Sequence, residues 1–312
     1  MSAIVPEEVV DSAAIASAST KRRSLWALAI RNPSVIFGGV ILLIMLAIAI
    51  LAPVLGTVDP TRIDPASRNK KPGTELTIRL EDGKTMKRVA LMGTDSLGRD
   101  VYSRVLYGTR VSLIVGVSVA IVAVSFGLVI GLVSGYIRWL DGFIMRIMDG
   151  LMAIPDILLA IAMMALFRAS VSNVVIAVTI PQVPRVVRLV RAVVLTIRER
   201  PYIEAAHSIG TRFRRVLTKH LLPNTIAPLI VQATYTGAAA VLTEAGLSFL
   251  GAGTPPNIPS WGNMMAEGRT FFQIAVWIIL FPGMFLAVTV LAVNLLGDGL
   301  RDALDPRLRR RM

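Results

Sequence analysis

The feature that most constrains this chain is a set of long apolar runs without a charged residue. Val111 to Ile137 contains no Asp, Glu, Lys or Arg, and the same holds for Val35 to Leu55 and for Thr270 to Gly297. About 20 apolar residues in a helix cross the ~30 Å hydrocarbon core of a bilayer. Backbone polar groups in lipid must be paired within the chain, so each run predicts a transmembrane helix.

Three further runs approach the same length but are interrupted by polar residues or prolines. They cover residues 147–167, 169–195 and 224–250. Hydrophobic residues make up 54% of the chain and the mean hydropathy is +0.66, which is typical of a membrane protein and not of a soluble domain. We therefore predict an all-α integral membrane protein with six transmembrane helices.

Basic residues predict the orientation of these spans. An even number of spans places both termini on one side, and the short segments on that side are rich in Lys and Arg, which marks it as cytoplasmic. The net charge of +13 is therefore interpreted as membrane orientation and not as a sign of nucleic-acid binding. The other side carries a long loop (56–110) that is also basic, but its length is near the limit at which the rule weakens.

These expectations divide the chain into segments. They are a cytoplasmic N-terminal tail (1–34), a first span (35–55), the extracellular long loop (56–110), a core with five spans (111–297) that includes a cytoplasmic central loop (196–223), and a basic cytoplasmic C-terminal tail (298–312).

The long loop has internal order of its own. The stretch LTIRLEDGKTMKRVAL reads as two short strands around Asp82-Gly83, a strong hairpin signal. Residues 93–110 read as an amphipathic helix that Asp95 or Ser96 caps. We expect this helix to lie in the membrane interface before the second span begins.

A smooth helical face runs along the second span. Its residues are Gly127, Gly131 and Gly135, spaced by four. Small residues at this spacing allow two helix backbones to approach closely, so we predict that this face packs against another helix.

The residue inventory argues against catalysis. The chain has no cysteine, which excludes disulfides, thiolate catalysis and cysteine-ligated metals. A distant alternative is an intramembrane hydrolase with Ser248 as nucleophile. Both histidines, His207 and His220, belong to the central loop, so a Ser–His pair is implausible.

The central loop has a design that a simple connection does not need. Pro201 suits a first helical position, and YIEAAHSI forms a short helix that Gly210 ends in a left-handed conformation. TRFRRVLTKHLL then forms a second helix, which Pro223 stops before the fifth span. We predict a compact knob of two angled helices; from the residues alone, an amphipathic loop that rests on lipid is an equal alternative.

The central loop resembles a known signature at this point. It matches the E-A-A-x3-G-x9-I-x-L-P pattern of permease subunits of bacterial ABC importers, with His220 in place of the isoleucine. The matching positions are Glu204, Ala205, Ala206, Gly210, Leu222 and Pro223. The resemblance implies a type I ABC importer permease fold, in which residues 204–210 dock into a groove on a separate ATPase subunit.

Further stretches resemble one branch of that family. GTDSLGRDVYSRVLYGTRVSL, EAGLSFLGAGTPPNIPSWGNMMAEGR and NLLGDGLRDALDPRLRR are similar to the second permease subunit of dipeptide, oligopeptide and nickel importers. This implies a bacterial plasma-membrane protein with a similar but distinct permease partner, two ATPase subunits that bind ATP and Mg²⁺, and an extracellular binding protein. The chain itself would bind no cofactor. Peptides are favoured as substrates, with nickel or a metal chelate as the alternative.

Charged residues inside predicted spans are costly and mark candidate path residues. Asp149 is expected to form an ion pair with Arg146, whereas Asp156 lies deeper and suits a path-facing role. Glu244 suits a gate or a helix contact equally. A free peptide carries an ammonium group, which an acidic residue attracts.

Two features at the ends of the spans complete the candidate list. The arginines at the inner end of the fourth span are expected to anchor at lipid headgroups or to couple to the central loop; they are Arg185, Arg188 and Arg191. Between the fifth and sixth spans, Trp261 is predicted to lie at the membrane interface. By resemblance, Trp261 and Glu267 belong to an outer rim that faces the binding protein.

Overall fold

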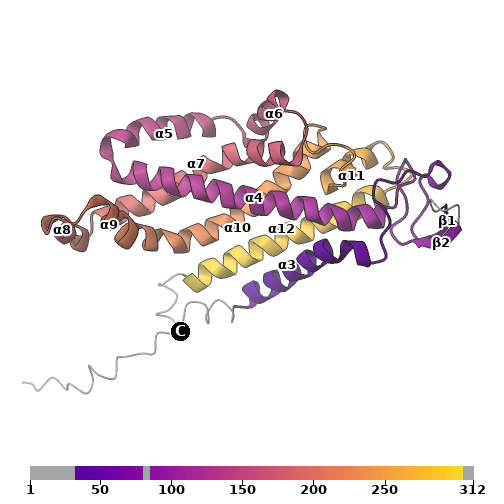
Figure 1. The fold of residues 1–312 in the computed structure, drawn as a ribbon, viewed down its shortest axis with the longest axis horizontal. Coiled ribbons are helices and arrows are strands. Elements are labelled where there is room, and N and C mark those ends of the chain that lie inside the picture. The colour runs from indigo at the N-terminus through magenta and orange to yellow at the C-terminus, as the bar shows by residue number, and fades with distance from the viewer. Residues whose placement is uncertain (1–31, 80–84, 305–312) are drawn as a thin grey trace, which may run out of the picture.

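The computed structural model describes residues 32–79 and 85–304 of this chain. Five long helices form a bundle with a two-stranded hairpin at one end and the central loop at the other (Figure 1). These helices are α3 (Pro33–Leu51), α4 (Val101–Tyr136), α7 (Val171–Arg198), α10 (Leu222–Phe249) and α12 (Trp277–Leu304). The two ends are called the hairpin end and the loop end below.

Shorter elements join or cap the long helices. They are η1 (Ala52–Val54), η2 (Pro65–Ser67), β1 (Thr74–Arg79), β2 (Thr85–Ala90), α5 (Arg138–Met152), α6 (Asp156–Leu166), α8 (Pro201–Ser208), α9 (Phe213–Val216), η3 (Leu217–Leu221) and α11 (Trp261–Arg269). In the part of the chain that the structure describes, five helices are long and apolar enough to cross a membrane, and the bent pair α5–α6 makes a sixth if it counts as one span. The predicted helical membrane fold is confirmed.

The glycine face of α4 packs against α7, as predicted. The two helices run in the same direction, and three glycine–valine contacts follow each other at intervals of four residues: Gly127 with Val186, Gly131 with Val190, and Gly135 with Val194. A Cβ atom on Gly131 would lie 2.7 Å from the Val190 Cβ. Because glycine has no side chain, these three positions of α4 allow the close distance between the two helices.

The third predicted span is bent, contrary to the expectation of one helix over residues 147–167. α5 ends at Met152, α6 begins at Asp156, and their axes meet at 90°. Pro155 causes the break, because proline has no N–H to donate and disfavours helical geometry in the residue before it. α5 also starts earlier than predicted, at Arg138.

The expected interfacial helix over residues 93–110 is not a separate element. α4 begins at Val101 and runs without interruption to Tyr136. Its N-cap is Asp100, whose side chain accepts from the Ser103 N–H, so Asp95 or Ser96 is the wrong cap. No proline or glycine pair interrupts the chain where the predicted boundary fell, and the helix continues.

The hairpin is confirmed. β1 and β2 pair in antiparallel register from Thr74 opposite Ala90 to Arg79 opposite Thr85, whereas the predicted Asp82-Gly83 turn lies outside the described residues. Beyond the hairpin, Gly93 has a φ of +76° and approaches the Trp277 indole, which donates to the Thr94 carbonyl at 3.0 Å. This contact ties the long loop to α12.

One other boundary moves, and the fourth span forms as predicted. The fourth span keeps Pro181 and Pro184 inside α7, where both are buried against neighbouring helices. The sixth span begins at Trp277 instead of Thr270, because residues 270–276 form a turn after α11. The N-terminal tail lies almost wholly outside the described residues, as does the end of the C-terminal tail from residue 305.

Candidate functional site

The central loop forms a projection at the loop end of the bundle (Figure 1). α8 ends at Ser208, and Gly210 turns the chain with a φ of +73°, as predicted. The Thr211 N–H donates to the Ala206 carbonyl at 3.0 Å and closes the turn. Two helices therefore meet at a glycine, which confirms the predicted first helix and turn of the knob.

One face of the knob is exposed and the other is anchored. Glu204, Ala205 and Gly210 are exposed, and the neighbouring Ile209 is 82% exposed. Ile203 is fully buried in a cluster with residues of α7, α9 and η3. An apolar side chain this exposed, next to small residues, leaves a surface that another protein is able to cover.

The back of the knob is attached to two long helices. Ile203 shares its apolar cluster with Ile197 near the end of α7 and with Val216 of α9. At the end of α4, the Tyr136 ring packs on the Phe213 ring with centroids 4.7 Å apart. Ala206 is also buried. Residues of α4, α7 and α9 therefore pack behind the exposed face.

The second helix of the knob continues into the fifth span. Phe213–Phe249 is continuous helix, with the π-helical turn η3 before Leu222, so Pro223 does not stop it as predicted. Proline has no N–H to donate within a helix, and the wider π-helical turn directly before it accommodates the ring. Pro223 is exposed and Leu222 is half-buried.

The acids of the third span form ion pairs with α7. Asp149 accepts from Arg188 at 2.6 Å, so the predicted partner Arg146 is wrong. Asp156 accepts from Arg185 at 2.6 Å and from the Gln182 amide at 3.2 Å. The bend between α5 and α6 places the two acids on helices whose axes meet at 90°.

Glu244 lies inside the chain and not on an open face. Its side chain has no exposed surface, and its Oε1 accepts from the Ser248 hydroxyl at 2.8 Å. Ser248 also lies 3.2 Å from the Thr254 hydroxyl, which donates to Ser260. Glu244 therefore joins the end of α10 to the following loop, and the helix-contact alternative describes it better than a gate or path residue in this conformation.

Trp261 is buried, in contrast to the predicted membrane-interface position. Its side chain has no exposed surface, and its indole donates to the Val105 carbonyl of α4 at 3.1 Å. Gly108 approaches the same indole closely. A side chain without exposed surface cannot touch a binding protein directly, so Trp261 fixes α11 against α4 instead.

Glu267 belongs to a charged cluster at the hairpin end. It accepts from Arg99 and from Arg104, the latter at 3.4 Å, and Arg99 also pairs with Asp95 at 2.6 Å. The Glu267 side chain is 26% exposed, whereas Arg104 is fully buried. Burial raises the pKa of Glu267, and the charges of Arg104 and Arg99 oppose that rise.

The comparison with protein families decides the identity of the chain. Residues 123–310 match the family described as "Binding-protein-dependent transport system inner membrane component", and residues 23–72 match the "N-terminal TM domain of oligopeptide transport permease C". The first match covers more than half of the chain. The chain belongs to this family of permeases. The resemblance seen in the sequence is confirmed.

Curated relatives match the permease over most of its length. It is 49% identical over 281 residues to the probable peptide ABC transporter permease protein y4tQ of Sinorhizobium fredii, covering 90% of this chain and 91% of that one. It is 41% identical over 280 residues to the dipeptide transport system permease protein DppC of Alkalihalophilus pseudofirmus, covering 89% and 88%. The permease is thus a multi-pass membrane subunit of a bacterial ABC importer with ATPase subunits and a binding protein.

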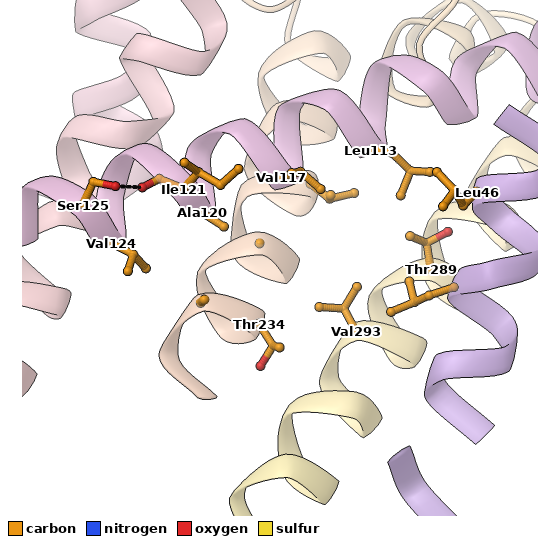
Figure 2. A pocket seen from close by; sticks show the side chains of 15 residues that line it. Leu46, Leu113, Val117, Ala120, Ile121, Val124, Ser125, Thr234, Thr289 and Val293 are labelled. Atoms are coloured by element: carbon orange, nitrogen blue, oxygen red, sulfur yellow. Dashed lines mark hydrogen bonds between the residues drawn. The ribbon is translucent and has the colours of Figure 1, made fainter. Parts of the chain in front are cut away.

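The permease has an open cleft between α3, α4, α10 and α12 (Figure 2). Its volume is about 590 Å³, and Leu46, Leu113, Val117 and Val293 are among the apolar side chains around it. The Ser125 hydroxyl on its rim donates to a carbonyl of its own helix, at 2.7 Å. No charged side chain lines this cleft, so it offers no partner to the charged ends of a peptide.

One charged residue of the permease, Asp141, was not predicted as a site residue from the sequence. Asp141 of α5 accepts from Arg191 of α7 at 2.6 Å, although it falls in a predicted short connection. The signal was present, because Asp141 is eight residues before Asp149 and both therefore lie on one face of a helix. The pattern was not recognised because α5 begins earlier than the predicted third span.

Proposed function

We propose that this chain is a membrane-spanning permease subunit that imports peptides by alternating access. The observation that carries the proposal is the anchored knob, whose exposed face consists of the signature residues Glu204, Ala205 and Gly210. The relatives support the substrate class, since two of them are named as a peptide and a dipeptide permease. Nickel or another metal chelate is the alternative substrate.

The proposed assembly has five subunits. This chain pairs with a similar but distinct permease, two ATPase subunits bind ATP and Mg²⁺, and an extracellular binding protein delivers the peptide. The Lys/Arg distribution supports an orientation with both termini and the central loop in the cytoplasm. The loop end then faces the ATPases, and the hairpin end, with Glu267, faces the binding protein.

The knob transmits motion because it lies between two spans. Glu199 and Arg200 alone separate α7 from α8, and α9 continues through η3 into α10. The buried Ile203 and Val216 keep the knob packed on these helices. A displacement of the exposed face therefore moves α7 and α10 as bodies, because close-packed helices shift together and do not deform smoothly.

The proposal is tested by blocking the exposed face. Ala205→Trp places a large ring on the knob without disturbing a buried contact, because Ala205 is exposed. The expected result is a chain that inserts normally but no longer co-purifies with the ATPase subunits. The matched control is Ala66→Trp, the same change at an exposed alanine of the hairpin end. Full ATPase binding by Ala205→Trp would contradict the proposed docking face.

The role of Asp156 as a path residue is tested separately. Its side chain is 27% exposed beside Arg185, which leaves an acidic group accessible to a peptide ammonium. Asp156→Asn keeps the size and the hydrogen-bonding oxygen, so we expect weaker uptake with unchanged assembly. Unaltered transport kinetics would remove Asp156 from the path. Asp149, whose side chain is 57% exposed, is the second position to test in this way.

A further inference from the structure

The helix α5 packs on the bundle mainly through half-buried side chains. Met148 is its one buried residue, although the helix runs from Arg138 to Met152. Trp139 is 79% exposed and Phe143 is 68% exposed. Helices of membrane bundles are ordinarily positioned by close van der Waals packing. The apolar packing of α5 is therefore sparse, and polar contacts contribute to its position.

These polar contacts are a series of ion pairs with α7. From α5, Asp141 pairs with Arg191 and Asp149 pairs with Arg188; from α6, Asp156 pairs with Arg185. The three arginines are spaced by three residues and share one face of α7. Both parts of the bent span are thus attached to the same helix, one on each side of the bend.

The helix that receives these ion pairs is itself fixed to α4 and to the central loop. The contacts of the three α4 glycines with Val186, Val190 and Val194 pack α7 closely against α4. Arg198 at the end of α7 donates to the Gly135 carbonyl at 3.0 Å. The next helix is α8, which carries the exposed face of the knob. A displacement of the knob therefore acts directly on α7.

We infer that Arg185, Arg188 and Arg191 are positioning residues that carry motion of the central loop from α7 to the bent span α5–α6. The inference rests on the proposed function. The Arg188 and Asp149 side chains are about half exposed in this chain, at 47% and 57%. Charged groups of a span avoid lipid, so in the assembled importer this face meets water or protein. The ion pairs of Asp141 and Asp149 stay closed while α7 moves, so the bent span moves with α7.

A charge swap tests the inference in the complete transporter in proteoliposomes. Arg188→Asp places two acids together and should lower peptide transported per ATP hydrolysed, by the 5- to 150-fold (roughly) that ordinary coupling energies represent. Asp149→Arg should do the same, and the double variant should recover coupling. The control is Arg146→Asp, because Arg146 is an exposed arginine of α5 without an ion pair to any residue that the structure describes. Unchanged coupling in the single variants, or no recovery in an assembled double variant, would overturn the inference.

A covalent replacement tests the same link without a charge reversal. The chain contains no cysteine, so Asp141→Cys with Arg191→Cys introduces its only two thiols. We expect reduced coupling in this variant, recovery with a bifunctional thiol reagent, and no recovery with a monofunctional one. Loss of transport on cross-linking would overturn the inference, because the link would then have to open. Binding-protein-stimulated ATP hydrolysis should persist in every variant; its absence in the wild-type complex would instead refute the proposed function.

Discussion

The packing of α4 on α7 gives the sharpest prediction about stability. Gly131→Ala adds one methyl group, 2.7 Å from the Val190 Cβ and 2.9 Å from the Val187 carbonyl oxygen. The oxygen belongs to the backbone and cannot rotate away. Overpacking of this kind costs ~1–3 kcal/mol, whereas alanine gains ~0.5–1 kcal/mol over glycine in a helix interior. Because the backbone oxygen cannot move, the upper half of the overpacking range applies, about 2–3 kcal/mol, and we expect a net destabilisation of about 1–2.5 kcal/mol.

A matched glycine separates packing from helix propensity. Gly142 lies in α5, and a Cβ atom added there would meet nothing within 4 Å. Gly142→Ala should therefore stabilise the chain by ~0.5–1 kcal/mol, the opposite sign. The measurement is thermal unfolding of the purified chain in detergent, followed by circular dichroism. Val190→Gly in the Gly131→Ala background removes the clashing Cβ, so the pair should lose less stability than the sum of the two single changes.

Equal effects at the two glycines would refute this reasoning. A destabilising Gly142→Ala would mean that other atoms of the isolated chain occupy the space beside Gly142. A neutral or stabilising Gly131→Ala would mean that α4 and α7 separate easily. In that case the rigid pair on which the transmission of motion depends would not exist.

Three further changes test the buried polar groups and the long loop. Glu244→Gln keeps an acceptor for the Ser248 hydroxyl and should unfold near the wild-type temperature. Glu244→Ala removes that acceptor, which should cost ~1–3 kcal/mol of stability. Equal unfolding midpoints for the two variants would argue against the contact. Glu267→Lys adds a cation beside buried Arg104 and should reduce both stability and binding-protein-stimulated ATPase activity more than Glu267→Gln does. Hydrogen bonds from Thr61 lower the pKa of Asp59, so this turn is stabilised above the ordinary Asp pKa and loses that stabilisation as the pH falls through the lowered value. Amide protection in the turn should follow that pH dependence in the wild type and not in Asp59→Asn.

Local patterns were sufficient for much of the architecture. Uncharged runs predict spans because a charged side chain exposed to lipid is costly in any span. This cost does not depend on which helices pack nearby. The glycine spacing in α4 predicted a packing face, and Gly210 predicted the left-handed turn of the knob, since both depend on the backbone of a few adjacent residues. The signature around Glu204 was readable for the same reason.

The boundaries between neighbouring elements were harder to predict. The start of α4 at Val101 and the passage of the chain through Pro223 into α10 each join two segments that looked separate. The sequence shows where a helix is disfavoured, but tertiary contacts decide whether it continues. The bend at Pro155 is the opposite case, in which one proline outweighed a long apolar run.

What the sequence alone determined is the membrane fold and the glycine turn of the knob, because both follow from hydropathy and from residues that are adjacent in the chain. What only the tertiary structure decided is which charges meet. Asp149 pairs with Arg188, 39 residues away, and not with the nearby Arg146, and Trp261 is buried against α4 instead of lying at an interface. Such partners depend on how the helices cross, and helix crossing is set by packing across the whole bundle.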